Sequence, residues 1–254
     1  MCSGLYYILT VLFGLAVGSF LNAYIWRLKK GNSVWRGRSI CPECKHNLSW
    51  LDLVPVLSYA VLKGRCRYCG KKISLQYPLV ELATAILFVL VLYIHLEAGN
   101  GLHFILRDWF FIAVLMIIFV YDLKWGYILD RVSLPAIIIA FSANILVGFS
   151  WQNLLLAAAI GSGFFLLQYA ISHGKWIGGG DIRMGALMGF ILGWPNIVVG
   201  LFLSYIVGST VAVYLLALKK KKMGSTIAMG TFLAVGTVIA MLWGVDILMW
   251  YLQF

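Results

Sequence analysis

The chain has 254 residues, of which 62% are hydrophobic and only 11% are charged, and its mean hydropathy is +0.93. A soluble domain carries about 25% charged residues, so this composition excludes a single soluble globular domain. The net charge of +11 would suit nucleic acid. However, Lys and Arg lie almost wholly between long apolar runs, as membrane topology requires. We therefore expect a protein of the lipid bilayer that does not bind nucleic acid.

Long apolar runs predict membrane-spanning helices, which need about 18–20 residues each. The first run, residues 5–28, lacks the cleavage-site pattern of a secretory signal peptide, so we interpret it as a retained helix. Seven further runs follow, at residues 78–96, 108–122, 132–149, 153–172, 182–194, 196–217 and 229–250. The run at 182–194 is short and ends at Pro195, so seven spans with one re-entrant segment would fit nearly as well.

The expected fold is an all-α polytopic membrane protein of about eight transmembrane helices, in three parts. Residues 1–28 form the first transmembrane helix, residues 29–77 a small hydrophilic subdomain between the first two helices, and residues 78–254 the remaining membrane core. Gly14 and Gly18 have the spacing that lets two membrane helices approach closely.

The distribution of basic residues predicts the orientation of the chain in the membrane. Residues 27–77 hold 11 of the 20 Lys and Arg residues. If this segment is cytoplasmic, 19 of the 20 face the cytoplasm and only Arg107 faces outward, as the positive-inside rule demands. The N-terminus then lies outside. The lysine run 219–222 is better explained as a topology anchor than as a patch for lipid or nucleic acid.

The hydrophilic segment contains two CxxC pairs, Cys41 with Cys44 and Cys66 with Cys69. Each pair can place two thiolates on one tight turn, and two such turns complete a tetrahedron around zinc. Disulfides are the alternative, which a reducing cytoplasm opposes. A site closed by four thiolates has no open position for water or substrate, so we expect structural zinc that orders the subdomain.

Two aspartates stand apart from the other acidic residues. Asp122 ends an apolar run, and Asp181 follows Gly178, Gly179 and Gly180. Ionisable groups at membrane depth are costly and are functional candidates by default. The predicted topology puts both at the same depth, near the cytoplasmic face. The remaining acids lie in loops or at span ends, where solvation explains them: Glu43, Asp52, Glu81, Glu97, Asp108, Asp130 and Asp246.

A pair of adjacent carboxyl groups can hydrolyse a peptide bond. Two carboxylates about 3 Å apart share one proton, so one activates water while the other protonates the scissile carbonyl. The run Gly178–Gly180 would allow a substrate strand to approach closely. Asp130 competes with Asp122 as the partner of Asp181, although an Asp before a new span also commonly caps a helix. Glu81, just after Pro78, is ordinary helix-start chemistry on local grounds.

Several motifs, in order along most of the chain, resemble those of the type 4 prepilin peptidases. Tyr121-Asp122, with Asp130 eight residues later, resembles the first aspartate motif of that family. Gly178-Gly179-Gly180-Asp181 resembles the second, of the GxGD type. The other matching stretches are the opening signature at 14–27, the four-cysteine module at 38–44, 48–50 and 64–70, and the segment 73–82.

This resemblance implies a bifunctional enzyme of the bacterial inner membrane, in type IV pilus assembly or type II secretion. Such an enzyme removes the leader of prepilins and pseudopilins at the cytoplasmic face, usually after a glycine. It then methylates the new N-terminus with S-adenosylmethionine. The catalytic aspartates of the family fall on Asp122 and Asp181, and Asp130 matches a recurring non-catalytic acid. The resemblance gives Glu81 no role and identifies no residue that binds S-adenosylmethionine.

Other functions stay open at this point. The chain could be a peptidase without methyltransferase activity, or a non-enzymatic, zinc-stabilised membrane assembly factor with structural acids. A transporter is disfavoured, because the acids lie near one face rather than at the midplane and the sequence shows no internal repeat.

Overall fold

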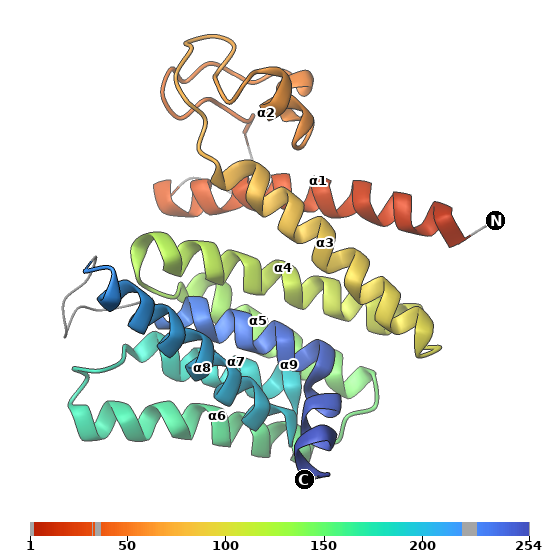
Figure 1. Ribbon diagram of the computed structural model, residues 1–254, viewed down its shortest axis with the longest axis vertical. Coiled ribbons are helices and arrows are strands. Elements are labelled where there is room, and N and C mark those ends of the chain that lie inside the picture. The colour runs from red at the N-terminus through yellow and green to blue at the C-terminus, as the bar shows by residue number, and fades with distance from the viewer. Residues whose placement is uncertain (1–2, 32, 34–36, 220–227, 254) are drawn as a thin grey trace. The chain divides into compact units, whose positions relative to one another are not determined.

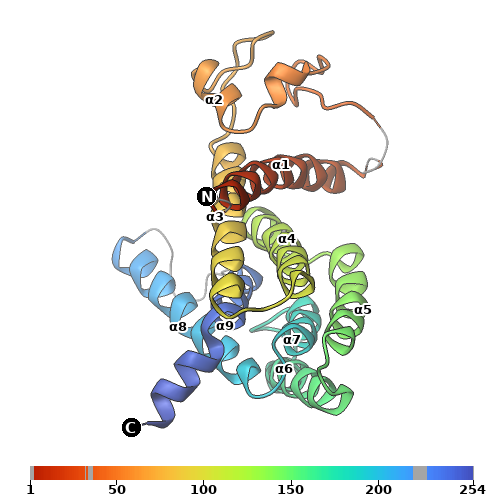
Figure 2. The same cartoon turned by 90° about the vertical axis from the view of Figure 1, so that its right-hand side faces the viewer.

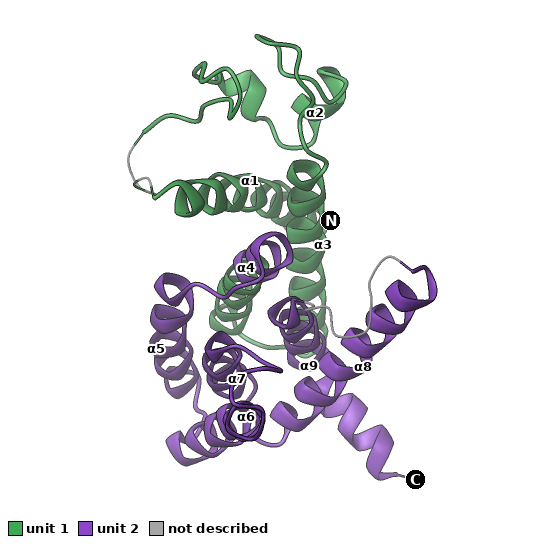
Figure 3. Ribbon diagram, turned by 90° about the vertical axis from the view of Figure 1, so that its left-hand side faces the viewer, with its two compact units in different colours: residues 1–116 green, residues 117–254 purple. Residues whose placement is uncertain are grey.

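The computed structural model describes residues 3–31, 33, 37–219 and 228–253 (Figure 1). Two compact units divide the chain, residues 1–116 and residues 117–254 (Figure 3). The helix α4 (Leu102–Trp125) belongs partly to each. Lys220, Lys221 and Lys222 of the predicted topology anchor lie outside the described residues.

Unit 1 joins two long apolar helices through a small, mostly irregular subdomain. Its helices are α1 (Ser3–Lys30), a 3-10 helix η1 (Trp50–Leu53), α2 (Leu57–Val61), α3 (Gln76–Glu97) and the first part of α4. A Cβ atom added at Gly14 or Gly18 would lie only 2.6 Å from the Cα atom of Ala85 or Glu81, respectively. The predicted close packing of the first span is therefore confirmed, and its partner is α3.

Unit 2 surrounds one short helix with longer ones. It contains α5 (Asp130–Leu146), α6 (Trp151–Ser172), α7 (Gly179–Leu192), α8 (Asn196–Ala217) and α9 (Met229–Leu252). The central helix α7 contacts α5, α6, α8 and α9. Figure 2 shows α7 between α5, α6 and α9. A Cβ atom at Gly185 would meet the carbonyl oxygen of Gly161 on α6 at 2.3 Å. The two backbones thus touch, and α7 is buried by protein.

The all-α prediction is confirmed: the described residues form helices, with isolated β-bridges and no strand. Every predicted apolar run lies on a helix, but only six helices there are long and apolar enough to cross a membrane, namely α1, α3, α4, α6, α8 and α9. α5 has 17 residues and contains Pro135, and α7 has 14. α7 can be short because its neighbours, rather than lipid, cover its apolar side chains. The chain is therefore a multi-pass membrane protein.

Candidate active site and metal site

Asp122 lies near the end of α4 and is held by the first turn of α9. Its side chain is buried, with the residue only 3% exposed. Its Oδ2 atom accepts a hydrogen bond from the backbone N–H of Thr231 at 2.8 Å and from the Thr231 hydroxyl at 3.2 Å. The first N–H groups of a helix have no partner within the helix and favour negative charge. The beginning of α9 therefore supplies the polar environment that a buried carboxylate requires.

Asp181 lies in the first turn of α7, where its own glycine run supports it. The residue is 8% exposed. Its Oδ2 atom accepts from the backbone N–H of Gly178 at 3.0 Å. A carboxylate at the third helical position often reaches back in this way to the residue before the helix. Because Gly178 has no side chain, it returns no hydrogen bond of its own.

The structure brings the two aspartates together within unit 2, around the side chain of Ile128. Asp122 is close enough to Asp181 for their charges to interact. A Cβ atom at Gly180, next to Asp181, would lie 3.2 Å from the Cβ atom of Ile128. A Cβ atom at Gly230 would lie 2.8 Å from Ile128 Cδ1 and 3.0 Å from Asp122 Oδ2. The segments carrying both acids therefore converge on one small volume.

Asp130 occupies a different environment from the buried pair. It begins α5, its side chain is 51% exposed, and its Oδ1 atom pairs with the guanidinium of Arg183 on α7. Arg183 is two residues beyond Asp181 in the sequence, so this ion pair links the start of α5 to the start of α7. Asp130 is thus engaged at the surface with a cation rather than buried beside a carboxylate.

Glu81, which the sequence explains as ordinary helix-start chemistry, lies in unit 1, and because α3 begins at Gln76 it falls beyond the first turn. It is buried on α3, and its Oε2 atom accepts from the backbone N–H of Val56 at 2.8 Å. The hydroxyl of Ser19 also bonds to it. Val56 has φ +61°, a left-handed conformation that is unfavourable for a β-branched residue. Glu81 therefore anchors a strained turn of the cysteine-containing subdomain to α3, which explains a buried acid at this position.

The four cysteines Cys41, Cys44, Cys66 and Cys69 form one cluster. Their sulfur atoms all lie within 4.8 Å of one another. Four sulfurs bound to one zinc at about 2.3 Å would be about 3.8 Å apart, so this set needs only a small contraction. The cluster is therefore arranged to bind a metal ion through thiolates.

Two copies of the same turn build the cluster. In the first, the N–H of Cys41 donates to His46 and that of Lys45 donates back to Cys41. In the second, the N–H of Cys66 donates to Lys71 and that of Gly70 donates back to Cys66. The residue after each CxxC pair has a positive φ, and a β-bridge flanks each turn, Ile40 to Asn47 and Arg65 to Lys72. The spacing within each pair thus dictates the local fold.

Asp52, expected from the sequence to be solvated, instead joins the start of η1 to the second of these turns. Its side chain is only 3% exposed. It accepts from the backbone N–H and hydroxyl of Ser49, from Arg67 Nε at 2.9 Å and from the Tyr68 hydroxyl at 3.1 Å. Burial raises the pKa of Asp52, but the hydrogen bonds from Ser49 and Tyr68 and the charge of Arg67 outweigh it and lower that pKa. The expectation failed because the partners lie 15 and 16 residues away.

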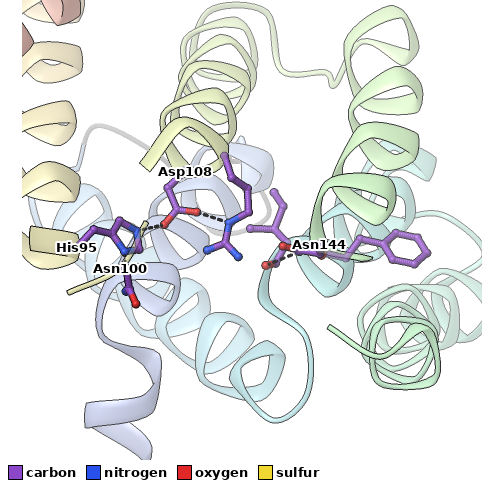
Figure 4. Close-up of polar contacts among 7 residues, drawn as sticks. His95, Asn100, Asp108 and Asn144 are labelled. Atoms are coloured by element: carbon purple, nitrogen blue, oxygen red, sulfur yellow. Dashed lines mark hydrogen bonds and ion pairs between the residues drawn. The ribbon is translucent and has the colours of Figure 1, made fainter. Parts of the chain in front are cut away.

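Asp108 was also expected to be solvated, and the structure buries it in the α3–α4 hairpin (Figure 4). Its carboxylate bonds His95 Nε2 at 2.8 Å and accepts from Arg107 Nε at 2.7 Å. The other ring nitrogen of His95 bonds the side chain of Asn100 at 2.9 Å (Figure 4). This network closes the hairpin between the two helices, so Asp108 has a structural role.

Two family models match the chain, one in its N-terminal part and one in its C-terminal part. Residues 12–95 match the bacterial peptidase A24 N-terminal domain, and residues 109–213 match the type IV leader peptidase family. A protein of Aeromonas hydrophila is 34% identical over 98% of this chain and 94% of its own length. One of Bacillus subtilis is 32% identical over 95% of this chain and 96% of its own length.

A Pseudomonas aeruginosa protein is 31% identical over 96% of this chain and 93% of its own length. All three relatives are named prepilin leader peptidase/N-methyltransferase. No solved structure matches the chain. Similarity that extends over nearly the whole length, with both family models in the same order, shows that this chain is a member of the type IV leader peptidase family.

Proposed function

We propose that this inner-membrane protein is an aspartic endopeptidase that removes the leader peptides of type 4 prepilins or pseudopilins, with Asp122 and Asp181 as its catalytic pair. One observation carries the proposal. Two buried aspartates from separate helices converge on one volume, and each is supported by backbone N–H donors at a helix start. Burying two acids together is costly, so the arrangement calls for a function.

The hydrogen bonds suggest how the two acids divide the work. Thr231 gives Asp122 two donors, which stabilise an ionised carboxylate, whereas Asp181 accepts one N–H from Gly178. Asp122 is therefore the base that takes a proton from water, and Asp181 holds the shared proton. We assign the Oδ1 atoms of both residues to water and substrate, because these donors occupy Oδ2.

In the first step, water oxygen bonds to the scissile carbonyl carbon while Asp122 takes its proton and Asp181 protonates the carbonyl oxygen. In the second step, the tetrahedral intermediate collapses. The C–N bond breaks as the amine leaving group receives the proton held by Asp122, and Asp181 recovers a proton from the collapsing hydroxyl group. General acid–base help of this kind contributes roughly 10²- to 10⁴-fold to rate.

We propose that Cys41, Cys44, Cys66 and Cys69 hold a structural zinc ion. Four mutually close thiols match the donor set of closed zinc sites, in which the metal stabilises the fold and takes no part in the reaction. The basic residues of this subdomain support its placement, together with the active site, at the cytoplasmic face and the N-terminus outside.

Methylation of the new N-terminus is proposed as a second activity, on the strength of the names of the relatives. S-adenosylmethionine would supply the methyl group when bound. We assign no residue to that step. A peptidase without this activity remains the second candidate, and the mass of the processed pilin distinguishes the two.

The test is mass spectrometry of a prepilin incubated with purified, reconstituted enzyme. Asp122→Asn and Asp181→Asn should each lower the cleavage rate about 10²- to 10⁴-fold, since each removes one acid–base group. Asp130→Asn is the matched control, because it breaks only an exposed ion pair worth at most about 1 kcal/mol. Unimpaired cleavage by both catalytic-site variants would contradict the roles of Asp122 and Asp181, whereas a wild-type protein that cleaves no prepilin would favour a zinc-stabilised assembly factor.

A further inference from the structure

Ile128 is a buried residue in an otherwise exposed loop. The loop joins α4 to α5, and its neighbours Gly126, Tyr127 and Asp130 are exposed, whereas Ile128 is only 9% exposed. Apolar side chains in short surface loops rarely find such cover. The loop therefore holds Ile128 against a specific surface of unit 2.

Both ends of the loop fix Ile128 in place. The N–H of Gly126, at φ +70°, donates to the carbonyl oxygen of Asp122 at 2.8 Å and ends α4. The hydroxyl groups of Tyr121 and Tyr127 lie 2.8 Å apart and hydrogen-bond, so the loop is stapled to α4. Beyond Ile128, α5 begins at Asp130. A β-branched side chain has few rotamers, so this one forms a stiff wall.

The surface that Ile128 covers includes two glycines, each adjacent to the proposed catalytic residues. Gly180 precedes Asp181, and its missing Cβ atom would lie 3.2 Å from Ile128 Cβ. Gly230 precedes Thr231, the partner of Asp122, and its missing Cβ atom would lie 2.8 Å from Ile128 Cδ1. Since neither glycine offers a side chain, Ile128 fills the apolar space beside the two carboxylates.

We infer that Ile128 is a specificity-determining residue, which limits the size of the substrate side chain next to the cleaved bond. The inference rests on the proposed function. In an extended substrate, neighbouring residues are about 3.3 Å apart along the strand. When Asp122 and Asp181 hold the scissile carbonyl, the residues on either side of the cleaved bond therefore lie against Ile128. Shortening Ile128 opens this space. A pocket difference of one or a few methylene groups changes discrimination by roughly 10- to 200-fold.

The experiment compares kcat/KM of the reconstituted enzyme on a prepilin that carries Gly, Ala or Val at one flanking position. One series varies the residue before the cleaved bond and a second series the residue after it. In one series, Ile128→Ala should raise the ratio of kcat/KM on the Ala or Val substrate to kcat/KM on the Gly substrate at least about tenfold. Ile128→Val, which removes one methyl group and disturbs packing least, should raise it by a smaller factor in the same series.

Ile191→Ala is the matched control. Ile191 is equally buried on α7, ten residues and about 15 Å along the helix from Asp181, so its truncation should leave every ratio unchanged. Suppose that both Ile128 variants still cleave the Gly substrate and that their Ala-to-Gly and Val-to-Gly ratios of kcat/KM stay within twofold of wild type. This result would refute the inference about Ile128 and leave the proposed function intact. Wild-type enzyme that cleaves no prepilin at all would instead refute the proposed function.

Discussion

The metal site and the active site are assembled by opposite means. The four cysteines lie within 29 residues of sequence, on two copies of one hydrogen-bonded turn. The proposed catalytic pair depends on contacts between distant segments, since Asp122 and Thr231 are 109 residues apart. The cysteine cluster is a product of local sequence, and the proposed catalytic pair is a product of helix packing. Changes to the cysteines or their metal should therefore act on the metal site, whereas changes to helix packing should act on the active site.

Loss of metal should have the largest effect and should fall on the local site. Structural zinc contributes about 10–16 kcal/mol in small zinc domains. Cys41→Ser, or chelation of the wild type, should release the ion and expose the subdomain at 37–75 to protease. Metal analysis and limited proteolysis measure both effects.

Cys2→Ser is the control for that experiment, because Cys2 belongs to neither CxxC pair. It should change neither metal content nor proteolysis. Two results would contradict a structural metal site at the cysteine cluster: wild-type protein that carries no metal, or a Cys41→Ser variant with an unchanged digestion pattern.

A smaller but sharper effect is expected from one methyl group at the packed site. Gly230→Ala would put a Cβ atom 3.0 Å from Asp122 Oδ2 and 2.8 Å from Ile128 Cδ1, so the carboxylate must shift. A displacement approaching 1 Å costs about 10²-fold in rate, which a prepilin cleavage assay would detect. Gly163→Ala on α6 is the matched control, since its Cβ atom meets nothing within 4 Å. Equal activity of the two variants would show that packing around Asp122 is not critical.

The weakest expected effect concerns Asp52 and pH. Its folded-state pKa lies below its usual value, so its contribution to stability is present above the unfolded pKa, about 3.9, and is lost as pH falls through the folded pKa. Asp52→Asn should remove about 2 kcal/mol at neutral pH, the scale of charged hydrogen bonds. Proteolysis of the subdomain as a function of pH tests this, because the variant should lose the wild-type dependence below pH 4 or so.

Glu43→Gln serves as the comparison for Asp52→Asn. The Glu43–Lys71 ion pair is in the same subdomain but exposed, so its loss should cost at most about 1 kcal/mol. If Glu43→Gln destabilises the subdomain as much as Asp52→Asn does, the buried Asp52 carboxylate does not stabilise the subdomain more than an exposed ion pair does.

Local patterns in the sequence predicted the features that depend on local physics. Apolar runs located every long helix, and the two CxxC pairs located the cysteine cluster. The glycine pair Gly14 and Gly18 predicted close helix contact, which the structure confirms. In each case one segment contains the whole signal.

Features that depend on folding of the whole unit could not be predicted in the same way. Thr231 and Ile128 gave no signal, because their importance arises only when α4, α7 and α9 pack together. Asp108 was misjudged because its partner His95 lies 13 residues away across a turn. The central position of α7 likewise follows from tertiary packing, and its short length alone suggested only a re-entrant segment.

The central claim is that Asp122 and Asp181 act as one catalytic unit. Single-turnover cleavage of a prepilin by Asp122→Asn, Asp181→Asn and the double variant measures this coupling. Residues that act as a unit are strongly non-additive. The account predicts that each single variant loses nearly all the catalysis and that the double variant is no slower than either. Losses that multiply in the double variant, or wild-type cleavage by either single variant, would contradict it.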